Sequence, residues 1–391
     1  MNRENKQLTL IEKWELDIKA YKEGAKVETA VPQCETCKYY IKGDALHCKF
    51  FEDEKKPRDV IFIEKECTSF VSNNLLDLGF LNEYEKRIYG GIFGFCIGDM
   101  LGVPVEFSSR KERDDDDVKE LRAYGTYHQP FGSWSDDTSL MLCLIDAFNE
   151  GFSMDKLAEN FVKYYRNALF TPNGEMFDIG ISTKNAINKF IHGEEPVKCG
   201  GSTEKDNGNG SLMRILPLAY LRRKYNAEQM IELAENVSSI THAHNRSKLA
   251  CIIYVEFASQ LIQGKEKLVA YEETIEFIGK NCNEVYANEF NNFETILNKN
   301  IIDFKREKIK STGYVVDTLE AVFWLFLNKN SYEEMVLGAV NLGGDTDTIA
   351  AIVGGLSGIY YGFNSIPDRW VQNVKRKNEI NEMIKGFLKV I

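Results

Sequence analysis

Apolar residues recur at intervals of three and four positions through most of the chain after residue 86. The spacing is seen in segments such as LMLCLIDAF, AEQMIELAENV and DTLEAVFWLFL. It places apolar side chains on one face of an α-helix, and the alternation typical of β-strands is scarce. Short clusters of Gly, Pro, Asn and Asp separate the segments and are typical of turns. The pattern therefore predicts a multi-helix, all-α domain.

Two of the predicted helices carry a glycine at every fourth position: Gly90, Gly94 and Gly98 in one, and Gly354, Gly358 and Gly362 in the other. A glycine inside a helix costs about 1 kcal/mol relative to alanine, so three on one face need a packing reason. Close approach of two helix backbones is such a reason. We therefore expect both helices at the centre of the bundle, packed against each other, with the acidic residues at their ends brought together.

The first 78 residues are polar, show little helical periodicity and contain four of the nine cysteines, Cys34, Cys37, Cys48 and Cys67. The CxxC pair is followed after ten residues by the third cysteine and after eighteen more by the fourth. Four thiols in a short segment with little apolar core are typical of a structural zinc site. His47 as a substitute ligand, an iron–sulfur cluster and unliganded thiols are the alternatives. We expect a small Cys-rich module in residues 1–78, which recruits a partner, and an all-α domain in residues 79–391.

Composition narrows the function classes. Of the 391 residues, 43% are hydrophobic, which is ample for a large core and excludes a disordered chain. The net charge of −11 argues against a general nucleic-acid-binding protein, because phosphate contacts need clustered Lys and Arg.

The N-terminus lacks the continuous apolar stretch of a signal peptide, so a cytoplasmic location is expected. Residues 88–107 and 348–367 are apolar but rich in Gly and polar residues, which favours buried core helices over membrane spans.

Two predicted helix starts carry more acidic and hydroxyl residues than a cap needs. They are SDDT at residues 135–138 and DTDT at residues 345–348. A single acid or hydroxyl there is fully explained as a cap that accepts bonds from free backbone N–H groups. Four carboxylates brought together repel one another unless a cation neutralises them. Because all these ligands are oxygens, they favour a hard ion such as Mg²⁺ or Mn²⁺ over zinc or copper.

Three further segments have both a structural and a functional interpretation. Asn-Gly turns and Ser211 before an apolar run, in DNGNGSLMRILPLAYL, are typical of a turn followed by a capped helix. The same glycines would also let a phosphate or sugar approach backbone N–H groups, with Arg214 adding charge. His242, in THAH, and Asp178, in FDIG, are also explained as structural residues. A serine hydrolase built on Ser211 and His242 is disfavoured because the sequence has no GxSxG motif.

Six blocks, taken in order, resemble the ADP-ribosylglycohydrolase family, most closely the dinitrogenase-reductase-activating glycohydrolases. They are IGDMLGVPVEF (97–107), GSWSDDTSLM (132–141), FDIGISTKNAI (177–187), GNGSLMR (208–214), THAH (241–244) and LGGDTDTIAAIVGGLSG (342–358). The resemblance covers roughly residues 84–370 and leaves the Cys-rich N-terminus outside it. Six ordered motifs are far more specific than any one of them.

The resemblance implies a compact all-α domain with two Mg²⁺ or Mn²⁺ ions in a cleft that binds ADP-ribose. By motif, the metal ligands would be Ser135, Asp136, Asp137, Asp345, Asp347 and Thr348. Glu106 matches a mobile acidic residue near the metals, and Asp178 matches an acid implicated in catalysis. The ribose and diphosphate would contact His242 and the loop of Gly208, Asn209, Gly210 and Ser211.

These residues fit the cleavage of a glycosidic bond at the ribose anomeric carbon, which needs an oriented water and a proton for the leaving group. We therefore expect a metal-dependent hydrolase that removes ADP-ribose from a modified protein. Arginine is the expected linkage, and either Asp178 or Glu106 is the acid/base. The alternatives are hydrolysis of a serine, metabolite or nucleic-acid conjugate, an inactive relative that binds ADP-ribose, and a phosphohydrolase that cuts the diphosphate.

Overall fold

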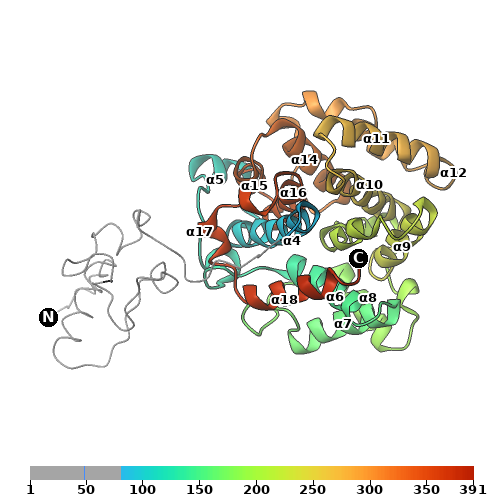
Figure 1. The fold of residues 1–391 in the computed structure, drawn as a ribbon, viewed down its shortest axis with the longest axis horizontal. Coiled ribbons are helices and arrows are strands. Elements are labelled where there is room, and N and C mark those ends of the chain that lie inside the picture. Colours follow the sequence, from blue (N-terminus) through green and yellow to red (C-terminus); the bar gives the residue numbers. More distant parts are fainter. Residues whose placement is uncertain (1–47, 49–80) are drawn as a thin grey trace. The chain divides into compact units, whose positions relative to one another are not determined.

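The computed structural model describes residue 48 and residues 81–391, and this part of the chain consists of α-helices joined by turns and short 3₁₀ segments (Figure 1). Its α-helices are α4 (Glu83–Gly102), α5 (Arg110–Asp115), α6 (Asp136–Asn149), α7 (Met154–Asn167), α8 (Ile181–Ile191), α9 (Ala227–Ser239), α10 (Asn245–Ile262), α11 (Lys267–Asn281), α12 (Asn283–Tyr286), α13 (Glu294–Leu297), α14 (Val315–Asn328), α15 (Tyr332–Val340), α16 (Thr346–Tyr361), α17 (Asp368–Val371) and α18 (Lys377–Phe387). Within these residues no β-strand is formed, and extended pairing is limited to isolated bridges. The all-α prediction is confirmed.

The predicted Cys-rich module lies outside the described residues, except for one position. Cys48 is described and is buried, whereas Cys34, Cys37 and Cys67 are not described. The zinc site therefore stays a prediction, as does the boundary near residue 78.

Helices α4 and α16 lie side by side at the centre of the helical domain (Figure 1). They run antiparallel, because Gly90 faces Gly358 whereas Gly94 faces Gly354. A Cβ atom at Gly94 would lie 2.5 Å from the Gly354 carbonyl oxygen, closer than real Cβ contacts. The two backbones therefore touch, as the spacing of the glycines predicted.

The contact departs from the prediction at one position. Gly362 was expected to pack, but it follows the end of α16 with φ +80°, and nothing lies within 4 Å of a Cβ built there. The prediction was wrong because the four-residue spacing continues past the helix end, where glycine adopts a left-handed conformation without strain. Ala350 forms the third contact, since a Cβ at Gly98 would lie 2.0 Å from its carbonyl oxygen. We call Gly90, Gly94, Gly98, Ala350, Gly354 and Gly358 the glycine seam.

The central position of α4 explains its apolar sequence. Among the described residues, one segment, Glu83–Val105, has the length and apolar composition of a membrane span, and 94% of its most apolar window is buried within the protein. Helices α10, α14 and α15 also pack against α16. Phe257 of α10 stacks on Phe323 of α14 with ring centroids 4.7 Å apart. These contacts are those of a core helix pair.

Several helix starts are fixed by local caps. Asn82, Ser153, Asn226 and Ser331 each accept a hydrogen bond from the backbone N–H three residues later. Replacing such a cap by alanine costs about 1 kcal/mol. The starts of α6 and α16 differ from this pattern, and they carry the two acidic clusters.

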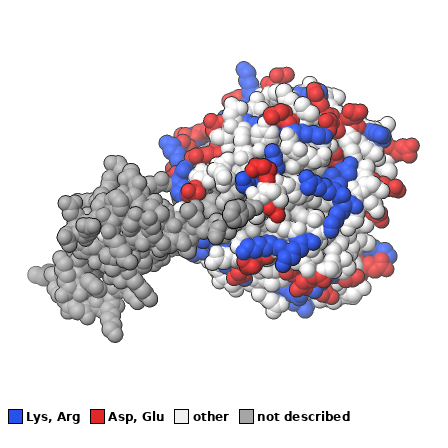
Figure 2. Space-filling view, viewed as in Figure 1, with Lys and Arg blue, Asp and Glu red and all other residues white. Residues whose placement is uncertain are grey.

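The surface agrees with the acidic composition. On the face drawn in Figure 2, separate patches of Lys and Arg side chains lie among Asp and Glu side chains. Mixed charges of this kind do not form the basic stripe that general nucleic-acid binding requires.

Candidate active site

The end of α4 and the start of α16 meet because the two helices run antiparallel along the glycine seam. A Cβ at Gly102, the last residue of α4, would lie 2.3 Å from the Cα atom of Asp347. The Thr346 hydroxyl donates a hydrogen bond to the Gly102 carbonyl at 2.9 Å. The 3₁₀ segment η1 (Val103–Val105) then leads directly to Glu106. Glu106 is therefore held beside the first turn of α16.

Three acids converge at this point. Glu106, Asp345 and Asp347 each place a carboxylate oxygen within 4.8 Å of the other two. Glu106 is 7% exposed and Asp347 is 1% exposed. Burial, and then the charge of Asp178, raises the pKa of Glu106 to about 8. Burial, and then the charge of Glu106, raises the pKa of Asp347 well above its usual value. Both shifts report negative charge that is crowded and poorly solvated.

The start of α6 supplies two more acids. Asp137 Oδ2 accepts hydrogen bonds from the Ser135 hydroxyl at 3.1 Å and from the Thr348 hydroxyl at 3.3 Å, which joins the first turns of α6 and α16. Asp136 accepts a hydrogen bond from the Gly180 amide at 3.3 Å. Burial raises the pKa of both acids well above the usual value, and neighbouring carboxylates raise it further. The structure thus brings all six predicted metal ligands to the place where α4, α6 and α16 meet.

Capping does not explain these acids. Asp345 precedes α16 but its side chain makes no capping bond, and its Oδ2 accepts a hydrogen bond from Asn209 Nδ2 at 2.6 Å. At the start of α6, Asp99 of α4 accepts from Ser135 N at 2.9 Å and from Thr138 N at 3.0 Å, and the Ser135 hydroxyl accepts from Asp137 N at 3.2 Å. Asp347 Oδ1 accepts from Thr348 N at 2.8 Å, but Asp136, Asp137 and Asp345 bond to groups other than the N–H groups of their own helix starts.

Sequence reasoning assigned no role to Asp99. It is fully buried, and burial raises its pKa to about 6 while hydrogen bonds from Thr138 and Ser135 oppose the rise. The available signal was an acid inside an apolar, glycine-rich helix, because a buried carboxylate needs partners. Its partners lie on another helix, so the sequence could not name them.

Tyr127 was also missed. It lies in the 3₁₀ segment η2 (Gly125–Tyr127), and burial, followed by the charges of Asp178 and Glu106, raises the pKa of its hydroxyl. Burial raises the pKa of both acids, and a hydrogen bond with the Tyr127 side chain opposes the rise in each. Asp178 is held by its backbone, whose carbonyl accepts from the Tyr164 hydroxyl at 2.5 Å. Both predicted acid/base residues therefore share one tyrosine.

The cluster fits a hard divalent cation. Two buried carboxylate oxygens, Glu106 Oε2 and Asp137 Oδ1, have no hydrogen-bond partner among the described residues. A buried charge without a partner costs several kcal/mol unless a cation or a proton neutralises it. The surrounding donors are carboxylate and hydroxyl oxygens, which are the ligands of Mg²⁺ and Mn²⁺.

The 208–211 loop borders the acids through Asn209. By donating to Asp345, the Asn209 amide fixes the orientation of one predicted metal ligand. Gly210 gives space to His242, because a Cβ there would lie 2.8 Å from Cε1 of the imidazole. Burial lowers the pKa of His242 to about 3, so the ring is neutral at physiological pH. Gly208 lies beside the same ring, since its Cβ would lie 3.5 Å from Nε2.

Ser211 lies beneath this loop. It is fully buried, and its hydroxyl accepts a hydrogen bond from Ser238 at 2.9 Å and lies 3.4 Å from Cys251 Sγ. Because its hydroxyl is engaged there rather than with His242, the serine hydrolase alternative gains no support. Ser211 does not cap a helix either. The predicted helix is replaced by two 3₁₀ segments, η5 (Leu212–Arg214) and η6 (Leu216–Leu221), in a stretch where Pro217 has no N–H to donate.

Arg214 is fully buried behind the loop. It donates to the Gly210 carbonyl and to the Thr241 hydroxyl, and its guanidinium lies 4.9 Å from the centre of the Phe161 ring. The expectation that it adds charge to a bound anion was therefore wrong. Its role is to hold the loop in place.

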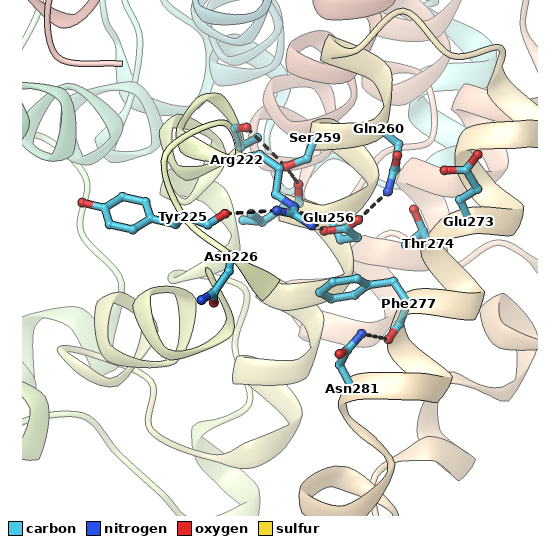
Figure 3. Close-up of polar contacts among 12 residues, drawn as sticks. Arg222, Tyr225, Asn226, Glu256, Ser259, Gln260, Glu273, Thr274, Phe277 and Asn281 are labelled. Atoms are coloured by element: carbon cyan, nitrogen blue, oxygen red, sulfur yellow. Dashed lines mark hydrogen bonds and ion pairs between the residues drawn. The ribbon is translucent and has the colours of Figure 1, made fainter. Parts of the chain in front are cut away.

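A separate cavity of about 570 Å³ lies beside η6 and α10 and is lined by Tyr84, Ala219, Arg222, Arg223, Gln260, Ile262, Gln263 and Lys265. Figure 3 shows part of its wall, where Arg222 donates to the Tyr225 carbonyl and Gln260 donates to Glu256. Lys265 pairs with Glu273. None of the lining residues belongs to the acidic clusters, so this cavity is not part of the site.

Comparisons with known proteins identify relatives of this chain. Residues 81–391 match the family model of the ADP-ribosylglycohydrolases. The ADP-ribosylarginine hydrolase Tri1 of Serratia proteamaculans is 30% identical over 77% of this chain and 79% of its own. Tri1 of Pseudomonas putida is 31% identical over 88% and 85%, and the ADP-ribosyl-(dinitrogen reductase) glycohydrolase of Rhodospirillum rubrum is 26% identical over 78% and 96%.

A solved structure, of an ADP-ribosylglycohydrolase-related protein complex, superposes with a TM-score of 0.65 at 26% identity, covering 79% of this chain and 99% of its own. It shares the fold of the described domain. With the family match spanning residues 81–391, and with the motif residues gathered at one place, the chain belongs to the ADP-ribosylglycohydrolase family of hydrolases.

Proposed function

We propose that this protein is a cytoplasmic, Mg²⁺- or Mn²⁺-dependent hydrolase that removes ADP-ribose from arginine side chains of modified proteins. The proposal is carried by the buried carboxylates where α4, α6 and α16 meet, because Glu106 Oε2 and Asp137 Oδ1 have no hydrogen-bond partner in the described chain. Acids that only capped helices would not be left in this state. The arginine linkage is supported by the two relatives named as ADP-ribosylarginine hydrolases.

The proposed metal ligands come from two helix starts. Ser135, Asp136 and Asp137 lie at the start of α6, and Asp345, Asp347 and Thr348 lie at the start of α16. Divalent ions held by these residues would bind the ribose hydroxyls and activate a water. Asn209 and the hydroxyl groups orient the carboxylates, which keeps the ligand geometry fixed before substrate arrives.

We assign the proton transfer to Asp178. Positive charge builds on the anomeric carbon as the bond breaks, so the leaving group needs a proton and the attacking water needs a base. Glu106 belongs to the group of three converging acids with Asp345 and Asp347, whereas Asp178 is not part of that group. The Tyr127 side chain, which opposes the rise in the pKa of both acids, would hold the Asp178 carboxyl toward the sugar.

We also propose that Cys34, Cys37, Cys48 and Cys67 bind zinc in a module that selects the target protein. The Pseudomonas relative matches 88% of this chain, which is more than residues 81–391 make up, so the similarity extends into the N-terminal segment. Deleting residues 1–78 should remove zinc and change target preference. If both stay as they are, the module proposal is wrong.

The test of the main proposal is release of free ADP-ribose from an arginine-ADP-ribosylated protein. We expect release with Mg²⁺ or Mn²⁺ that a chelator abolishes, and a loss of more than about 100-fold in Asp345→Asn. Asp303→Asn, which changes an exposed acid in the 3₁₀ segment η8 (Asn300–Asp303), is the matched control and should behave like the wild type. AMP as the product would instead indicate cleavage of the diphosphate. Metal-loaded protein that leaves the conjugate intact would refute the arginine linkage.

A further inference from the structure

A row of three aromatic rings runs alongside the catalytic acids. The Phe107 and Tyr127 ring centroids are 6.4 Å apart, and those of Tyr127 and Phe177 are 5.2 Å apart. Phe107 directly follows Glu106, and Phe177 directly precedes Asp178. We call Phe107, Tyr127 and Phe177 the aromatic row. Because Phe107 and Phe177 are the chain neighbours of Glu106 and Asp178, and Tyr127 contacts both rings, the row runs beside the two acids.

Packing in the protein core does not explain the position of Phe107. Its side chain is 71% exposed, so it contributes little to the core. Its backbone has φ +64°, a left-handed conformation that costs a residue other than glycine about 1 kcal/mol or more. The amide of Phe107 donates to the Gly344 carbonyl at 2.7 Å, which ties this conformation to the loop before α16. A strained backbone that presents an exposed aromatic ring beside catalytic acids is typical of a ligand contact.

The chemistry of the row favours a planar cation. Aromatic faces carry negative charge density and attract guanidinium groups, which also stack on them. Divalent ions bound to the clusters would cancel much of the attraction of the carboxylates, but they would leave the ring faces unchanged. A serine or phosphate conjugate has no cation to place here. We propose that the aromatic row binds the guanidinium group of the arginine that carries ADP-ribose, and so selects the linkage; this rests on the proposed function.

Phe107 gives the sharpest test, because leucine keeps its apolar bulk and removes the ring. A cation–π contact contributes a factor of about 3 to 30 in binding. With an ADP-ribosylated arginine peptide as substrate, Phe107→Leu should therefore raise KM about 3- to 30-fold, while the inhibition constant of free ADP-ribose changes less than about twofold. Phe107→Tyr, which restores the ring, should return KM to within about twofold of the wild-type value. Leu268→Ala, at an exposed apolar position in α11, is the control for loss of surface apolar area.

Two results would overturn the inference. One is a KM that changes less than about twofold in Phe107→Leu. The other is an equal weakening of ADP-ribose inhibition, which would place the ring against the nucleotide instead. If the wild type does not cleave the peptide, the proposed function fails on its own. In that case the Kd of the same intact peptide is measured for wild type and Phe107→Leu. The inference then predicts the fold-change in Kd that was given above for KM.

Discussion

Gly98→Ala tests whether the glycine seam positions the active site. The added Cβ would lie 2.0 Å from the Ala350 carbonyl oxygen, whereas ordinary contact begins near 3.4 Å. The seam must therefore open by about 1.4 Å, the difference between these distances, because both neighbours are helix backbone and no flexible side chain can move aside. Overpacking of this kind costs about 1–3 kcal/mol, and alanine regains about 1 kcal/mol of helix propensity. Because the helix backbone itself must move, we take the upper end of the overpacking cost. The expected net loss in the free energy of unfolding is then about 2 kcal/mol.

Gly279→Ala is the matched control. Gly279 is also helical, in α11, but nothing lies within 4 Å of a Cβ built there. Without a clash, alanine should stabilise the protein by about 1 kcal/mol. Urea unfolding followed by circular dichroism would measure both variants. Equal stability of Gly98→Ala and wild type, or an equal loss in both variants, would refute the argument from packing.

The same substitution should affect the chemistry. A shift of about 1 Å between α4 and α16 moves Glu106 relative to Asp345 and Asp347, and misplacement of that size costs about 100-fold in rate. We expect Gly98→Ala to lose activity at temperatures where it is still folded, while Gly279→Ala keeps it. A folded Gly98→Ala with full activity would show that the seam and the site are independent.

Three further predictions concern residues around the acids. Asp99→Asn should lower the free energy of unfolding by about 1–3 kcal/mol, because the N–H groups of Ser135 and Thr138 at the start of α6 lose a carboxylate partner; an unchanged urea midpoint would contradict this. Folding raises the pKa of Glu106 from 4.5 to about 8, so the folded state holds this proton more tightly, and the Tm of chelator-treated protein should fall as pH rises through that range. Glu106→Gln should reduce the fall, and a Tm that rises with pH would be the opposite of what burial predicts. Asn209→Ala should weaken metal binding about 10- to 100-fold in calorimetric titration, since Asp345 loses its orienting amide; unchanged affinity would remove Asn209 from the site.

Much of the fold could be predicted because its signals are local. The spacing of apolar residues indicates helices directly, and the glycines of α4 and α16 indicate the central pair, since a costly residue repeated on one face needs a packing reason. Gly362 and the segment after Ser211 show where local sequence signals fail to predict the structure. Whether a helix continues or tightens into 3₁₀ turns depends on its neighbours in space, and a spacing pattern does not contain them.

The residues of the site likewise divide into those with a local sequence signal and those whose role depends on neighbours in space. Asp345 and Asp137 stood out because their helix starts carried more acids than capping needs, and the structure places them together. Asp99 and Tyr127 could not be found, because each acts on residues of another segment. Arg214 was misjudged for the same reason: its position in the sequence next to the loop suggested a ligand contact, but its side chain lies fully buried behind that loop.

Helix α4 joins both halves of the active site, although it contributes no proposed metal ligand. Its glycine seam fixes α16, and its Asp99 carboxylate fixes the start of α6. The carboxylates on the two helices repel each other, and helices joined only by flexible side chains would relax apart. A backbone contact cannot relax in this way, because it has no rotamers to change. The rigid backbone contact therefore keeps the carboxylates at the starts of α6 and α16 close together despite their repulsion.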